Sequence, residues 1–127
     1  MILVDASAWA DFFRGGRLAA AVDEALEDGL VSVCGPVLTQ LGRGLQARSR
    51  SKVLDLLGGC TLLDAPSELW MHAGDLGFSL ARQGAQVKPL NLLVAVYALT
   101  HDQLLLSTER DFRLMAKARV PLRLVAA

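Results

Sequence analysis

The fold of this chain is constrained most by short apolar runs that alternate with longer segments, in which apolar residues recur at helical spacing. The runs cover residues 2–4, 30–33, 61–63, 104–106 and 122–125, and each is long enough for one buried strand. Between them, apolar residues recur with the spacing of amphipathic helices. This alternation predicts an α/β fold with a central parallel sheet of four to five short strands and helices on both faces.

Glycine, proline and capping residues place the expected helix boundaries. We expect helices over residues 6–13, 17–28, 67–82, 89–100 and 110–119, and another that opens at Gly35 and Pro36. A further helix is expected to begin at a cap formed by Ser49 or Ser51 and to end near Leu57. Trp70 and Phe78, eight residues apart on one predicted helix, are expected to lie in the core.

Length, charge and cysteine content exclude several classes of protein. The chain has 127 residues, of which 53% are hydrophobic, so it can bury one full core, and we expect a single domain over residues 1–127. The 13 basic and 13 acidic residues exclude a basic field over the whole molecule. No apolar run approaches the roughly 20 residues of a membrane span, and Asp5 argues against a signal peptide. Two cysteines are too few for a disulfide scaffold, so we expect two buried thiols in a cytoplasmic protein.

Acidic residues follow two of the predicted strands. Asp5 ends the first strand, and Glu109 and Asp111 follow the strand at residues 104–106. If these strands are neighbours, the carboxylates meet at one edge of the sheet, where their repulsion favours a bound Mg²⁺ or Mn²⁺. Such an ion could promote phosphodiester hydrolysis. The same acids also suit the N-termini of two helices, and that structural alternative stays open.

Four segments of the sequence together resemble one family. They cover residues 2–9 (ILVDASAW), 37–44 (VLTQLGRG), 89–95 (PLNLLVA) and 105–112 (LLSTERDF). In this order and spacing they resemble the PIN-domain family, specifically the VapC-type ribonuclease toxins of bacterial toxin–antitoxin pairs. The resemblance covers nearly the whole chain. It implies a PIN-like three-layer fold and a single PIN-like domain over residues 1–127.

The resemblance also implies an activity, a cofactor and partners. The implied activity is metal-dependent cleavage of RNA phosphodiesters by an endoribonuclease with bound Mg²⁺ or Mn²⁺. The implied partners are a VapB-like antitoxin, an RNA substrate and a second copy of the chain in a homodimer. The implied catalytic positions are Asp5, Gln40, Asn91, Glu109 and Asp111, of which Asp5, Asn91, Glu109 and Asp111 would hold the metal, while Ser7, Ser107 and Thr108 would support the site.

Two of these positions depart from the family pattern. Gln40 stands where the family has a glutamate, and Asn91 stands where it has an aspartate. Both amides keep a carbonyl oxygen, but neither can act as a carboxylate base, and the loss of two negative charges should weaken metal binding. Natural divergence and deliberate inactivation would produce the same exchanges. The chain is therefore expected to be either an impaired nuclease or a non-catalytic PIN-like module that binds RNA or an antitoxin.

Two further groups of residues have both a functional and a structural interpretation. The basic residues between positions 29 and 54 could follow an RNA backbone or could form a solvated helix face; they are Arg43, Arg48, Arg50 and Lys52. Trp9, Phe12 and Phe13 could line a groove for a partner helix or belong to the core.

Overall fold

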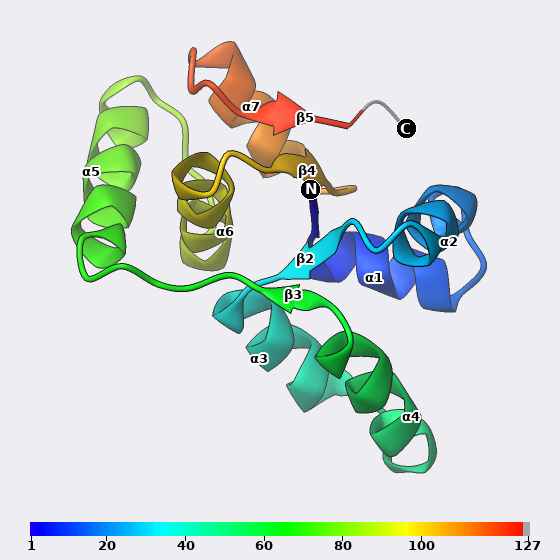
Figure 1. Cartoon of the computed structure of the whole chain (residues 1–127). Helices are drawn as coiled ribbons and strands as arrows, with labels where there is room; N and C mark the ends of the chain where they lie inside the picture. The colour runs from blue at the N-terminus through cyan, green and yellow to red at the C-terminus, as the bar shows by residue number, and fades with distance from the viewer. Residues whose placement is uncertain (126–127) are drawn as a thin grey trace.

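One parallel sheet runs through the centre of the protein (Figure 1). The structure is a computed structural model that describes residues 1–125. Its strands are β1 (Ile2–Val4), β2 (Val31–Val33), β3 (Thr61–Leu62), β4 (Leu104–Leu106) and β5 (Arg123–Leu124). They pair in the order β3-β2-β1-β4-β5, and every pair is parallel. The expected α/β class and the parallel sheet are confirmed.

Seven helices within residues 1–125 flank this sheet. They are α1 (Ala6–Phe13), α2 (Ala19–Glu27), α3 (Gly35–Gly44), α4 (Ala47–Gly58), α5 (Leu69–Arg82), α6 (Pro89–Thr100) and α7 (Arg110–Lys117). Figure 1 shows α5 and α6 to the left of the strands, α1 and α2 to the right, and the α3–α4 pair below. The sheet is therefore enclosed by helices, as expected for parallel strands buried on both faces.

The helix boundaries agree with the sequence to within two residues except at the start of α4. The predicted bounds of the first helix and of the helix at residues 89–100 are confirmed, whereas α4 begins at Ala47 and not after a serine cap. Leu45 and Gln46 both have extended backbone, with ψ of 141°, so the chain turns between α3 and α4 before it reaches Ser49. The Ser49 hydroxyl instead donates a hydrogen bond to the Gln46 carbonyl from within the first turn of α4.

The core joins the two central strands to the helices around them. Leu3, Val4, Leu105 and Leu106 are at most 1% exposed. Helix α6 is apolar almost all round because it lies between the core and α5. Gly77 permits this close approach, since a Cβ there would lie 2.8 Å from a methyl group of Leu92 on α6.

The outer face of α5 carries large apolar side chains that are not buried. Trp70, Met71 and Phe78 are 54%, 70% and 66% exposed, so the expectation that Trp70 and Phe78 lie in the core is wrong. Helix α5 packs inward through other residues, which are Leu69, Ala73 and Leu80. The spacing between Trp70 and Phe78 places them on a common face but does not say which face is covered.

The two cysteines differ in their burial. Cys34 is buried and Cys60 is only half-buried, so the expectation of two buried thiols holds for one of them. Burial raises the pKa of the Cys34 thiol to about 11, which leaves it protonated at neutral pH.

Over residues 1–125, no helix has both the length and the apolar character needed to cross a membrane.

Candidate functional site

The carboxyl ends of β1 and β4 mark the switch point of the sheet. From β1 the chain continues to β2 and β3 on one side, and β4 leads to β5 on the other. Val4 of β1 pairs with Leu106 of β4, and the Asp5 N–H then donates to the Leu106 carbonyl over 3.1 Å. The residues that follow these two strands therefore meet at the position where ligands bind in open α/β sheets.

Asp5 lies at this point with both carboxylate oxygens engaged. Its Oδ1 accepts hydrogen bonds from the Ser7 hydroxyl at 2.7 Å and the Ala8 N–H at 2.9 Å, which makes Asp5 the N-cap of α1. Its Oδ2 accepts from the Ser107 hydroxyl at 2.6 Å. Burial raises the pKa of Asp5, and the negative charge of Glu109 adds to this, although the three hydrogen bonds oppose it.

The same serines hold the loop that follows β4. The Thr108 N–H donates to Ser7 Oγ at 2.9 Å, and the Glu109 N–H donates to Ser107 Oγ at 2.9 Å. Thr108 therefore contacts this network through its backbone, whereas Ser7 and Ser107 contact it through their hydroxyls. The three positions that the sequence proposes as site support lie together around Asp5.

Asp111 forms a second centre in the first turn of α7. Its Oδ2 accepts from the Lys88 N–H and from the Asn91 amide nitrogen, both at 2.9 Å. Asp111 is 5% exposed and Asn91 is 7% exposed. Burial acts to raise the pKa of Asp111, but these hydrogen bonds and the charges of Lys88 and Arg110 outweigh it, so the pKa is lowered.

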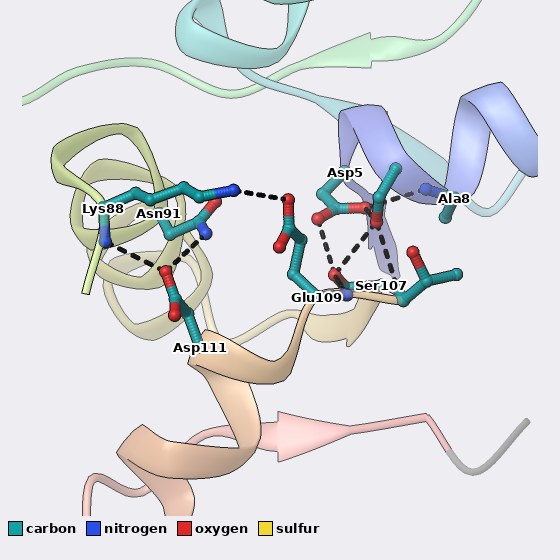
Figure 2. A network of polar contacts seen from close by, with 9 residues as sticks. Asp5, Ala8, Lys88, Asn91, Ser107, Glu109 and Asp111 are labelled. Carbon is teal, nitrogen blue, oxygen red and sulfur yellow. Dashed lines mark hydrogen bonds and ion pairs between the residues drawn. The ribbon is translucent and has the colours of Figure 1, made fainter. Parts of the chain in front are cut away.

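Glu109 and Lys88 connect the two centres. Figure 2 shows Glu109 between the Asp5 group and the Asp111 group, with its carboxylate turned toward Lys88. The Lys88 Nζ lies 3.6 Å from Glu109 Oε1. Sequence reasoning missed Lys88, although its position directly before the helix that carries Asn91 was a usable signal.

Gln40 lies apart from these hydrogen bonds, on the wall of a large groove. The groove has a volume of about 1010 Å³ and runs between α1 and the α3–α4 pair. Gln40 is exposed there, and Ser7 and Glu109 line the same groove. Its other lining side chains are mainly apolar with two cations; they include Phe12, Phe13, Leu41, Val53, Leu56, Arg14 and Lys52.

The groove distinguishes between the functional and structural interpretations of the aromatic and basic residues. Trp9 is fully buried in the core, while Phe12 and Phe13 line the groove. Of the four basic residues proposed for RNA, only Lys52 lines it. Arg48 and Arg50 instead donate hydrogen bonds to Gln46 Oε1 and to the Gly42 carbonyl, which ties them to the α3–α4 connection.

The side chains around the switch point do not fit a divalent cation as they are arranged. Over residues 1–125 no three or more His, Cys, Asp or Glu side chains are grouped so that they could hold a metal ion. Asn91 presents its nitrogen, not its oxygen, to Asp111, because a carboxylate can only accept a hydrogen bond. A lysine ammonium group stands beside the third acid, Glu109.

Comparison with known proteins identifies the family. A family model described as PIN domain matches residues 2–118. The chain belongs to the PIN domain family. It is similar to the VapC ribonuclease Mb1587 of Mycobacterium bovis and to the ribonuclease VapC11 of Mycobacterium tuberculosis, each 27% identical over 124 residues and over 92% of both chains.

Solved structures share the fold of this PIN domain. VapBC2 from Rickettsia felis, bound to a DNA fragment from its promoter, matches with a TM-score of 0.77 at 18% identity over 98% of both chains. DNA-bound VapBC from Salmonella typhimurium matches with a TM-score of 0.76 at 17% identity, over 98% of this chain and 96% of that chain. The PIN-like fold expected from the sequence is confirmed.

The two buried aspartates should respond to pH with opposite sign. The lowered pKa of Asp111 means that its ionised form stabilises the fold, and this contribution is lost as pH falls through the lowered value. The raised pKa of Asp5 means that its ionisation opposes folding, and this penalty disappears as pH falls. As pH falls from about 7 to about 3, the free energy of unfolding of the wild type should decrease relative to that of Asp111→Asn. Over the same range it should increase relative to that of Asp5→Asn. Urea denaturation of the three proteins measures this, and parallel changes for both variants would contradict it.

Proposed function

We propose that this chain is a VapC-type toxin of the PIN family that acts on RNA, is neutralised by a VapB-like antitoxin, and has an impaired ribonuclease site. The observation that carries the proposal is the groove, because Ser7 and Glu109 of the acidic switch point line it together with Gln40. The names of the related VapC ribonucleases support an RNA substrate. We also propose a cytoplasmic location, where such a substrate is found.

The groove suggests how an RNA strand meets the acids. Arg14 and Lys52 are the cations that line it, and they suit contact with backbone phosphates. Glu109 is the acid that lines it, so we propose Glu109 as the base that accepts a proton from an attacking water. We propose Asp5, Gln40, Asn91 and Asp111 as the remaining positions of the site.

The impairment follows from the chemistry of Gln40 and Asn91. Neither amide can accept a proton as a carboxylate does, and together they remove two negative charges. Mg²⁺ or Mn²⁺ would need those charges, so we derive no step through a metal for the chain as it stands. A carboxylate at both positions would create the donor set that the family pattern implies.

Restoring both acids should restore RNA cleavage. The variant Gln40→Glu/Asn91→Asp is expected to cleave single-stranded RNA with Mn²⁺ or Mg²⁺ at least about 100-fold faster than the wild type, since one positioned acid–base group alone contributes roughly 10²–10⁴-fold. Gel analysis of end-labelled RNA measures this. The control is Gln83→Glu/Asn91→Asp, because Gln83 ends α5 and does not line the groove. Cleavage by the wild type at the same rate as the double variant would refute the impairment.

A second candidate function is a non-catalytic PIN module. It is favoured by the contacts of Lys88 and Asn91, which neutralise and hydrogen-bond the acids without an added ion. Such a module would bind RNA or an antitoxin and would not cut. If the double variant also fails to cleave RNA while the wild type binds it, this candidate replaces the first.

The antitoxin is proposed to lie in the same groove. The apolar side chains from α1 and α4 suit the apolar face of a partner segment, and Glu109 suits a basic residue of that segment. A segment seated there would also exclude RNA from the acids. Binding and neutralisation would then have one structural cause.

Charge introduced into the groove should disrupt antitoxin binding. Val53→Asp is expected to weaken binding of the proposed VapB-like antitoxin by at least about tenfold, since a buried unpaired carboxylate opposes an apolar contact. The matched control is Leu54→Asp, because Leu54 is the exposed neighbour that does not line the groove. Calorimetric titration measures both variants, and equal losses would contradict the proposed site.

The exposed face of α5 supports the proposed homodimer. Trp70, Met71 and Phe78 lie within an arc of about 100° on this helix, and apolar side chains gathered in this way are typical of a protein interface. A second copy of the chain is the partner that the family pattern implies.

Phe78→Asp should convert the homodimer to a monomer. A carboxylate on the α5 face would be buried unpaired in the interface, so light scattering should give about half the wild-type mass. Leu62→Asp serves as control, because Leu62 is 58% exposed but lies on β3, away from α5. A wild-type mass for Phe78→Asp would place the interface elsewhere.

A further inference from the structure

Lys88 contacts two of the three acids of the site through two different atoms. Its ammonium group lies 3.6 Å from the Glu109 carboxylate, and its backbone N–H donates to Asp111 at 2.9 Å. Pro89 directly follows Lys88 and forms the first turn of α6, so the backbone of Lys88 is held at the N-terminus of that helix. One residue therefore brings a positive charge and a hydrogen-bond donor to the acidic cluster.

Asn91 completes this arrangement from within α6. Its amide nitrogen donates to the same oxygen of Asp111 that accepts from the Lys88 backbone. An aspartate at position 91 would place a second carboxylate at hydrogen-bond distance from Asp111. Two buried carboxylates so close repel each other, which raises the pKa of one of them and favours a cation between them. The asparagine avoids this repulsion.

Asp5 also has hydrogen-bond partners supplied by the chain itself. Three donors already satisfy its oxygens, namely the hydroxyls of Ser7 and Ser107 and the N–H of Ala8. Each carboxylate of the cluster thus has a partner supplied by the chain itself (Figure 2). This arrangement disagrees with the divalent cation that the family pattern implies.

We infer that Lys88 is the resident cation of this site and, together with Asn91, stands in for a divalent metal. The inference concerns the same cluster as the proposed function and rests on it only for the cluster's place in the site. The acidic cleft would then be complete in metal-free protein. A metal response would appear only when Asn91 or Lys88 is replaced.

Thermal unfolding with and without Mn²⁺ tests this directly. The wild type should unfold at the same temperature in millimolar Mn²⁺ and in chelator. Asn91→Asp should unfold at least about 3 °C lower in chelator and should regain that loss in Mn²⁺, because the ion then separates two carboxylates. Gln83→Glu is the control for an added acid away from the site, and it should show neither effect.

Lys88→Gln keeps the experiment decisive if Asn91→Asp folds poorly. The Lys88 side chain is 69% exposed, so its replacement leaves the core intact and keeps the backbone bond to Asp111. Because an exposed ion pair contributes little stability, Lys88→Gln should unfold near the wild-type temperature in chelator but should be stabilised by Mn²⁺. Lys117→Gln, on the exposed end of α7, should not respond to Mn²⁺.

The outcomes separate this inference from the proposed function. A wild type that is stabilised by Mn²⁺ as strongly as Asn91→Asp would overturn the role of Lys88 as resident cation. So would a pair of variants, Asn91→Asp and Lys88→Gln, that both fail to respond to the metal. Neither result depends on RNA cleavage or antitoxin binding, which test the proposed function by themselves.

Discussion

The hydrogen bond between Asp5 and Ser107 joins the two halves of the molecule at its functional edge. Asp5 follows β1 and Ser107 follows β4, and these strands are neighbours although about a hundred residues separate them in sequence. Because Asp5 also caps α1, one buried carboxylate fixes the start of that helix and the loop after β4. The groove and the acidic cluster both take their position from this link, since Ser7 and Glu109 belong to each.

The sequence predicted the fold because its signals are local and its central strands are buried on both faces. A run such as Leu104–Leu106 has no polar alternation and so indicates a covered parallel strand. The start of α4 was harder to predict, because the extended residues Leu45 and Gln46 connect α3 to α4 and no serine caps the helix. The location of Trp70 and Phe78 depends on which neighbour covers α5, and periodicity carries no information about that.

The site was predicted in part for the same reason. Residues that follow strands are placed by the sheet, so Asp5, Ser107 and Glu109 could be expected to meet. Lys88 could not be expected with them, because its contact with Glu109 depends on how the N-terminus of α6 packs beside the N-terminus of α7. Which atom of the Asn91 amide faces Asp111 is likewise a property of the folded environment and not of the residue type.

The amides at positions 40 and 91 therefore have different physical settings. Gln40 is exposed in the groove, so an acid at that position would change what the groove can bind or activate and would leave the core unaffected. Asn91 is buried against Asp111, so an acid at that position would change the electrostatic balance of the folded protein itself. An acid at position 91 needs a counter-charge before the chain can fold well, whereas an acid at position 40 does not. The asparagine thus allows the PIN fold to keep its acidic edge with Lys88 and Arg110 as nearby positive charges.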